Sequence, residues 1–143
     1  MEPLLGVAPG RLTLAAGGLI SGTPTATGTA TFTVKVVDAS LRSVTATLTL
    51  TVGAPLAFVA TTLPSGTHGT PYSTTTLQAS GGTPSYTWSL LPGSSLPPGL
   101  SLSSSGTVSG TPTTAGTYTF VVKVTDASSP AQTVQVSFTV TVS

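Results

Sequence analysis

Very few side chains in this sequence could carry out chemistry. The chain has one histidine, His68, the acidic residues Glu2, Asp38 and Asp126, and no cysteine. A Ser-His-Asp triad would need His68 to meet an aspartate, but His68 stands in a turn-rich stretch and both aspartates begin other predicted turns. Without paired carboxylates, a thiol or a phosphate-binding loop, the sequence predicts a protein that is not an enzyme. We expect His68 to be exposed to solvent.

Two lysines offer a second kind of chemistry, an isopeptide crosslink. That crosslink needs a buried Lys, an Asn or Asp acceptor and a neighbouring acid. Alternation along its predicted strand turns Lys123 away from the face that carries Phe120 and Val122, and the chain contains no Asn. We therefore interpret Lys35 and Lys123 as solvated lysines that protect a sheet edge.

The composition limits the classes of partner. Charged residues make up 5% of the chain and the net charge is +1, whereas nucleic-acid binding needs clustered cations to displace phosphate counterions. The sequence has no run of about 18 consecutive apolar residues, the length that spans a bilayer. We expect neither nucleic-acid binding nor membrane insertion. So little charge weakens the repulsion that keeps folded chains apart, which favours association.

Apolar residues alternate with Thr and Ser through most of the chain, as they do in strands with one wet face. Nothing has helical period. Strands are predicted at residues 12–14, 19–22, 29–37, 44–52, 56–61, 72–79, 85–91, 118–124 and 133–142. About seven short strands in roughly 90 residues, with turn signals between them, is the pattern of an immunoglobulin-like β-sandwich.

Residues 96–126 repeat residues 7–38 almost position for position. Gly22-Thr23-Pro24 corresponds to Gly110-Thr111-Pro112, and Phe32, Lys35 and Asp38 correspond to Phe120, Lys123 and Asp126. Such repetition indicates tandem modules. We predict that residues 1–52 are the C-terminal half of an Ig-like repeat and that residues 53–143 are a complete repeat. The start lacks the pattern of a secretory signal, and we expect the chain to be a piece of something longer.

The motifs of the complete repeat resemble a known family. They include Ala79-Ser80-Gly81-Gly82-Thr83-Pro84-Ser85-Tyr86-Thr87-Trp88, Leu96-Pro97-Pro98-Gly99-Leu100, Gly110-Thr111-Pro112, Gly116-Thr117-Tyr118-Thr119-Phe120 and Val124-Thr125-Asp126. The chain thus resembles the bacterial "putative Ig" family, cadherin-like and Ig-like repeats found in tandem in large surface and secreted proteins. The resemblance covers residues 56–142 completely and residues 7–52 as a half module. It implies an all-β fold, an Ig-like antiparallel β-sandwich, and service as a spacer, adhesive arm or accessory domain.

Three residues are expected to hold this sandwich together. Tyr118 and Phe120 have the spacing of an Ig tyrosine corner, with Phe120 at the place of the second Cys. Trp88 can fill the core where a disulfide would otherwise pack. The first copy has Ala30 in place of Tyr118 and Arg11 in place of Gly99, so its corner should be weaker.

The resemblance also raises a calcium site, since cadherin relatives bind calcium between modules. Asp38 and Asp126 are weak calcium candidates. A Ca²⁺ ion takes about six to eight oxygens, usually with several carboxylates, and the three acidic residues of the chain cannot form such a cage. We interpret each Asp instead as the start of a hairpin turn, with its side chain bonded to the backbone two residues on, and expect no cofactor.

Aromatic side chains could form a platform for sugar stacking. Tyr86 and Trp88 lie on the same face of their predicted strand as Leu90, which makes them core residues. Tyr72 is therefore the one candidate for an exposed aromatic. An adhesin or carbohydrate-binding accessory module, with a surface glycan or protein ligand, is therefore the alternative function.

The half module leads to the main functional expectation. Without counterparts of residues 56–91, its four predicted strands leave an apolar face wet, at a cost of several kcal/mol at about 25 cal/mol per Å². We expect a second copy of the chain or a neighbouring repeat to cover residues 1–52, by strand addition or sheet packing, with an open version building a fibre. Packing against its own neighbour, and an arbitrary cut from a longer array, stay open as alternatives. The predicted self-association residues are Phe32, Val34, Val36, Leu48 and Leu50. The expected role is a non-enzymatic extracellular spacer in a bacterial surface protein or filament.

Overall fold

The computed structural model describes residues 2–4 and 11–143 of the chain, and in these residues the regular structure is entirely β. The chain divides into two compact units, Met1–Ala54 (unit 1) and Pro55–Ser143 (unit 2). The described part contains no helix long and apolar enough to cross a bilayer. Residues 7–10, the start of the first copy of the repeat, lie outside the described residues.

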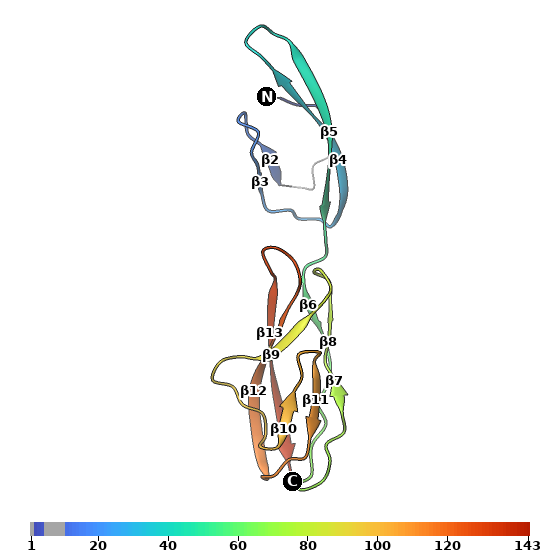
Figure 1. The fold of residues 1–143 in the computed structure, drawn as a ribbon, viewed down its shortest axis with the longest axis vertical. Helices are drawn as coiled ribbons and strands as arrows, with labels where there is room; N and C mark the ends of the chain where they lie inside the picture. The colour runs from blue at the N-terminus through green and yellow to red at the C-terminus, as the bar shows by residue number, and fades with distance from the viewer. Residues whose placement is uncertain (1, 5–10) are drawn as a thin grey trace. The chain divides into compact units, whose positions relative to one another are not determined.

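Unit 2 is a sandwich of antiparallel sheets (Figure 1). One sheet has the order β13-β12-β9, a second has the order β10-β11-β7, and β6 pairs with β8. The strands are β6 (Ala57–Val59), β7 (Thr75–Thr76), β8 (Gln78–Ser80), β9 (Thr87–Leu90), β10 (Leu100–Leu102), β11 (Thr107–Gly110), β12 (Gly116–Thr125) and β13 (Thr133–Val142). The all-β, Ig-like sandwich expected from the alternating pattern is confirmed.

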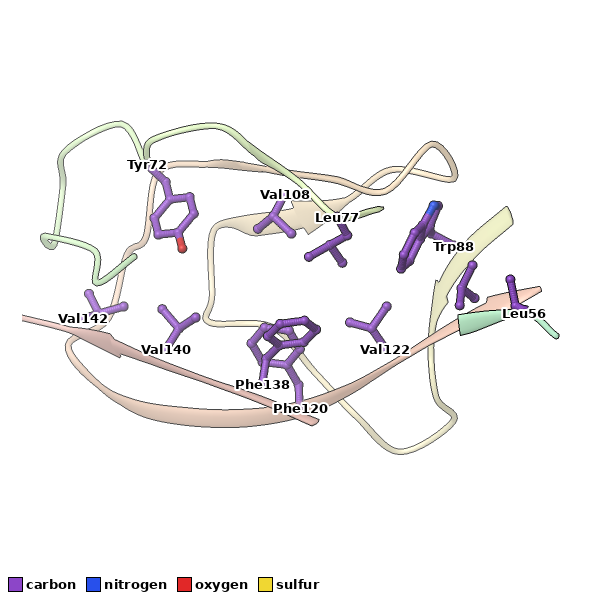
Figure 2. Packing of buried hydrophobic residues seen from close by; sticks show 11 residues of the cluster. Leu56, Tyr72, Leu77, Trp88, Val108, Phe120, Val122, Phe138, Val140 and Val142 are labelled. Atoms are coloured by element: carbon purple, nitrogen blue, oxygen red, sulfur yellow. The ribbon is translucent and has the colours of Figure 1, made fainter. Parts of the chain in front are cut away.

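The core of unit 2 follows from the alternation along β12 and β13. In Figure 2, Phe120, Phe138 and Val140 point from these strands toward Val108 and Leu77 of the opposite layer. The threonines between them face outward and are exposed. Full burial of one such apolar side chain stabilises the fold by about 1.5–3 kcal/mol, so this interior supplies most of the driving force for folding of unit 2.

The strand predicted at residues 72–79 is wrong in one respect, because two strands occupy this stretch. β7 pairs with β11, whereas β8 pairs with β6. The chain changes sheets at Leu77, whose side chain is 2% exposed and whose N–H donates to the Gly106 carbonyl at 2.9 Å. Residues 73–76 are Ser-Thr-Thr-Thr, which has no alternation of polar and apolar residues, so the sequence gives no sign of the change of partner.

Trp88 of β9 packs at one end of the core. It is 5% exposed, and its ring meets the Phe58 ring edge to face, with 5.8 Å between the centroids. Gly106 has φ +88°, and a Cβ at this position would lie 2.8 Å from the indole nitrogen. A larger residue at position 106 would therefore displace Trp88.

Unit 1 repeats the second part of this design. Its strands are β1 (Glu2–Leu4), β2 (Leu12–Leu14), β3 (Ile20–Gly22), β4 (Gly28–Val37) and β5 (Ser43–Val52). One sheet has the order β1-β4-β5, and β2 and β3 form a separate hairpin. Figure 1 shows this hairpin and the longer β4–β5 hairpin as distinct parts of the unit. β4 and β5 pair from Gly28–Val52 to Val37–Ser43, as β12 and β13 do from Gly116–Val142.

β1 is a strand that the sequence did not predict. It pairs antiparallel with β4, with Glu2 opposite Lys35, on the side of β4 that corresponds to the β9 side of β12. The expectation that unit 1 lacks counterparts of all the early strands is therefore wrong for one of them. β1 has three residues, one of them a proline, and such a short stretch cannot show a period of two.

The two units differ most in how well they cover equivalent positions. Val36 is 43% exposed whereas its counterpart Val124 is 1% exposed, and Ile20 is 38% exposed whereas its counterpart Val108 is 0% exposed. In unit 2, β6, β7 and β8 bring Leu77 and its neighbours over these positions. The described part of unit 1 has no counterpart of those strands, so its apolar face stays partly open.

Substituting Val124 tests the contribution of the covered face. We expect Val124→Ala to lower the free energy of unfolding of unit 2 by about 2 kcal/mol, because it removes buried methyl groups and leaves a cavity. Urea unfolding followed by the fluorescence of Trp88, the one tryptophan of the chain, measures the change. The control is Thr119→Ala on the exposed face of the same strand, with an expected change below about 0.5 kcal/mol. Equal losses in the two variants would contradict this account of the core.

Candidate functional site

Exposed apolar side chains gather in unit 1. The large apolar residues that are exposed in the described part of the chain are Leu19, Ile20, Val36, Val37, Leu41, Val44, Leu48 and Val59, and all but Val59 belong to unit 1. Single exposed apolar residues are ordinary, but a contiguous group marks a surface that binds something. Val36, Val44 and Leu48 of this group lie on the apolar side of the β4–β5 hairpin, which we call the open surface, whereas Val37 lies on the opposite side.

The predicted self-association residues all lie on this open surface. Val36 and Leu48 are 43% and 41% exposed, whereas Phe32, Val34 and Leu50 are half-buried. Val36 lies opposite Val44, and Phe32 lies opposite Leu48, in the β4–β5 ladder. The apolar strip is therefore most open toward the Val36–Val44 end of the hairpin. The role of these residues in association stays a prediction.

The other side of the β4–β5 hairpin carries paired threonines. The hydroxyl oxygens of Thr29 and Thr51 are 3.1 Å apart, and those of Thr33 and Thr47 are 3.4 Å apart. The side chains of the hairpin thus separate into a hydroxyl face and an aliphatic face, as the alternating sequence predicts.

β5 lies at the edge of its sheet, since the strand order is β1-β4-β5. In unit 2 the equivalent edge is partly covered. The Gly66 N–H donates to the Thr141 carbonyl at 2.9 Å, and the Ser143 N–H donates to the Gly66 carbonyl at 3.0 Å. Within the residues that the structure describes, unit 1 has no segment that covers β5 in this way.

The most elaborate polar group is Asp126, at the turn between β12 and β13. This side chain is 5% exposed. Its Oδ1 accepts from the Gln132 N–H at 2.7 Å and from the Ser128 hydroxyl at 2.6 Å, and its Oδ2 accepts from the Thr83 N–H at 2.8 Å. The Ser128 N–H also donates to Oδ1, at 3.2 Å, which confirms the predicted turn. Asp126 thereby ties the loop around Thr83 to the β12–β13 hairpin.

These contacts set the pKa of Asp126. Burial by itself would raise the pKa, because it disfavours the charged form. The Ser128 hydroxyl and the backbone N–H groups of Thr83, Gln132 and Ser128 outweigh burial and lower the pKa of Asp126 from 3.8 to about 2. The charged form is therefore the one that the fold stabilises.

Asp38 occupies the same turn position in unit 1 but is more open. Its Oδ1 accepts from the Ser40 N–H at 2.8 Å, so the predicted bond to the backbone two residues on is confirmed here as well. Its Oδ2 lies 3.1 Å from Nε of Arg42, and the side chains of this ion pair are 46% and 83% exposed for Asp38 and Arg42. An exposed pair of this kind contributes little stability.

Neither aspartate suits a calcium ion. The Asp126 oxygens are already held by N–H and O–H donors, which a cation would have to displace, and Asp38 faces an arginine. No group of three or more His, Cys, Asp or Glu side chains with metal-site spacing occurs within residues 2–4 and 11–143. The donor sets around the two weak calcium candidates therefore do not fit the ion.

The remaining candidates have structural surroundings. His68 is exposed, as predicted, and its backbone N–H donates to the Ser143 carbonyl at 2.7 Å. Lys35 and Lys123 do not lie at sheet edges, because β4 and β12 are the central strands of their sheets, and both lysines are half-buried. The edge interpretation was wrong because β1 and β9 pair with β4 and β12 as the third strands of the two sheets.

The aromatic residues do not form an exposed platform in the described part of the chain. Tyr72, expected to be exposed, is 6% exposed, and its hydroxyl donates to the Pro64 carbonyl at 2.7 Å. Burial raises the pKa of the Tyr72 hydroxyl. The Tyr118 hydroxyl donates to the Thr114 carbonyl at 3.2 Å, the contact of a tyrosine corner. Ala30 cannot make this bond in unit 1.

The comparison with protein families finds one match over both units. The family described as "Putative Ig domain" matches residues 5–53 and residues 54–143. No curated protein matches the chain.

Solved structures with the same fold come from large proteins. The extracellular domain of protocadherin GammaB4 is 16% identical, with a TM-score of 0.51, over 99% of this chain and 26% of that chain. A protocadherin gammaB7 EC3-6 cis-dimer is 18% identical, with a TM-score of 0.51, over 99% of this chain and 42% of that chain. A "putative alpha-galactosidase" from Bacteroides fragilis is 24% identical, with a TM-score of 0.51, over 63% of this chain and 18% of that chain. The chain thus spans less than half of each of these structures, and the likeness is one of fold.

The Asp126 contacts predict how stability depends on pH. The folded pKa of Asp126, about 2, lies below the ordinary 3.8, so its contribution is complete above about pH 4 and is lost as the pH falls toward 2. We expect the melting temperature of unit 2 to fall over this range in the unmodified chain. Asp126→Asn should melt lower at neutral pH and change less on acidification. Thermal melts followed by Trp88 fluorescence measure both effects.

Asp38→Asn is the matched control, since it changes the equivalent turn in unit 1. We expect it to leave the Trp88 transition and its pH dependence unchanged. An acid loss of equal size in Asp126→Asn and the unmodified chain would show that other groups cause it.

Proposed function

The chain belongs to the "Putative Ig domain" family, and from that premise we propose that it is a non-enzymatic extracellular repeat of a bacterial surface protein or filament. Its work is to space other parts of such an assembly and to associate with a second copy of itself through unit 1. Unit 2 serves as the complete, self-sufficient module, and unit 1, the proposed C-terminal half of a module, serves as the associating one.

One observation carries this proposal, the difference in cover between equivalent residues. Leu48 of β5 is 41% exposed in unit 1. Phe138, the equivalent residue of β13 in unit 2, is 8% exposed. The same sequence pattern thus builds a closed core in one unit and an open surface in the other. Covering apolar surface that is exposed to water favours association by about 25 cal/mol for each Å² covered. A partner that covers the apolar face of unit 1 would therefore supply the hydrophobic stabilisation that unit 2 obtains from its own strands.

The charge distribution supports self-association. No charged residue occurs between Arg42 and Lys123, and the strands of the open surface carry only Lys35. Two identical surfaces with so little charge repel each other weakly. The extracellular setting is an inference from the family and from the fold, which the extracellular domain of protocadherin GammaB4 shares.

Sedimentation velocity over a range of concentrations tests the proposal. We expect the chain to form a species larger than its 14.0 kDa monomer in the micromolar range. The double variant Val36→Thr, Val44→Thr replaces an opposed pair on the open surface and should weaken association by about tenfold, because less apolar area is covered. Val59→Thr changes an exposed apolar residue of unit 2 and should leave association unchanged.

A chain that sediments as a monomer at every concentration, with a cooperative melt, would contradict self-association. A glycan array separates the two classes of function. Specific binding to one glycan by a monomeric chain would favour the adhesin or carbohydrate-binding module instead.

A further inference from the structure

The first part of unit 2 includes a short segment that is bonded to the last strand. We call residues 64–68 the entry segment. Gly66 of this segment pairs with Val142 of β13 in a parallel bridge. The Gly66 N–H donates to the Thr141 carbonyl at 2.9 Å, and the Ser143 N–H donates to the Gly66 carbonyl at 3.0 Å. The entry segment and the end of β13 are thus hydrogen-bonded to each other and run in the same direction.

Two further hydrogen bonds fix the ends of the entry segment. The His68 N–H donates to the Ser143 carbonyl at 2.7 Å. At the other end, the Pro64 carbonyl accepts from the Tyr72 hydroxyl at 2.7 Å. Tyr72 is 6% exposed, so little water competes for this bond. The buried tyrosine therefore fixes the point at which the chain reaches β13.

The parallel direction decides how tension acts on these bonds. A spacer carries tension between its two ends. A pull toward the N-terminus draws the entry segment backward along its own direction, and a pull at Ser143 draws β13 forward. Because the two segments are parallel, the pulls oppose each other along a shared axis and load all the bonds between them at once. Figure 1 shows β6 near one end of unit 2 and the C-terminus near the other, as this loading requires.

The entry segment also protects the core. Gly66 lies over Val142, since a Cβ at Gly66 would lie 3.6 Å from Cγ2 of that valine, and Val142 is 2% exposed. β6 comes earlier in the chain and pairs with β8 through only three residues. Loss of the β6 pairing alone leaves the entry segment bonded to β13, whereas loss of the entry segment uncovers the end of the core.

We propose that the contact between the entry segment and the end of β13 is the tension-bearing contact of unit 2, and that the Tyr72 hydroxyl secures it through Pro64. This inference rests on the proposed role as a spacer, since a spacer transmits tension through its modules. It gives a role to the backbone of His68 as well. The core stabilises unit 2 against unfolding in general, and this contact resists extension of the chain in particular.

Tyr72→Phe tests the contact, and Tyr86→Phe is its matched control. The Tyr86 hydroxyl donates to the Gly81 carbonyl at 2.7 Å, so each variant loses one hydroxyl–carbonyl bond. The full chain is pulled through its two ends in an optical trap at constant force. We expect Tyr72→Phe to unfold unit 2 about fivefold faster than the unmodified chain, because extension must break the bond that it lacks. Tyr86→Phe should change this rate by less than about twofold, since its bond lies away from the loaded contact.

His68→Pro is a second variant that removes a backbone donor from the same contact. His68 is the second residue of a turn in which the Thr70 N–H donates to the Thr67 carbonyl at 3.1 Å and Gly69 has φ +72°. A turn of this kind, type II, accepts proline at its second position. The substitution therefore removes the bond to Ser143 and keeps the path of the backbone. We expect unit 2 of this variant to unfold about fivefold faster under force as well.

The length of chain released identifies the unit that unfolds. Unfolding of residues 55–143 adds about 250–300 Å at about 3.4 Å per residue, which is more than residues 1–54 of unit 1 can add. Urea unfolding followed by Trp88 fluorescence shows that each variant folds and gives its stability without force. We expect Tyr72→Phe and Tyr86→Phe to differ more under force than in urea.

The outcomes separate this inference from the proposed self-association. If Tyr72→Phe and His68→Pro unfold under force no faster than Tyr86→Phe, the inference is overturned, and association measured by sedimentation is unaffected. If the chain sediments as a monomer while both variants unfold faster than Tyr86→Phe, self-association is contradicted and the tension-bearing contact is supported.

Discussion

Burial of the aliphatic face of a long hairpin is the interaction on which the rest of this protein depends. β12 and β13 present alternating Phe and Val on one face, and the strands that precede them in unit 2 cover that face until its residues are almost fully hidden. β4 and β5 present the same kind of face without the same cover. The hydrophobic effect is proportional to the area removed from water, so the two hairpins contribute differently: the first stabilises its unit by burying its apolar face, whereas the second leaves part of that face exposed.

Polar contacts hold the turns but do not decide this difference. Asp38 and Asp126 both accept from the N–H two residues on, because an Asp side chain can make this bond in any open turn. Only Asp126 also reaches a distant segment, at Thr83, and that segment has no described counterpart in unit 1. The local geometry of a turn is therefore common to the two units, whereas the environment of its carboxylate depends on the strands around it.

The sequence predicted the long strands well and the short ones poorly. The hairpin strands have ten residues each that alternate almost without interruption, which indicates both their extent and their buried face. β1 has three residues, and the residues before Leu77 are a polar run without alternation, so neither β1 nor the change of sheets at Leu77 could be found from periodicity. The lysines were assigned to edges for the same reason, because the third strand of each sheet decides which strand is central. The residues of the open surface could be named from the sequence, since they occupy the repeat positions that form the core of unit 2.

By itself, the sequence determined the class of fold, the repeat and the two faces of each hairpin, because these follow from residue types at a spacing of two and from local turn chemistry. Only the tertiary structure decided which apolar residues are covered, that Tyr72 is buried, and which strand is central in each sheet. Cover depends on strands that are far away in the chain. A residue such as Val36 or Val124 has the same neighbours in sequence in both copies, and its exposure is set by what packs against it.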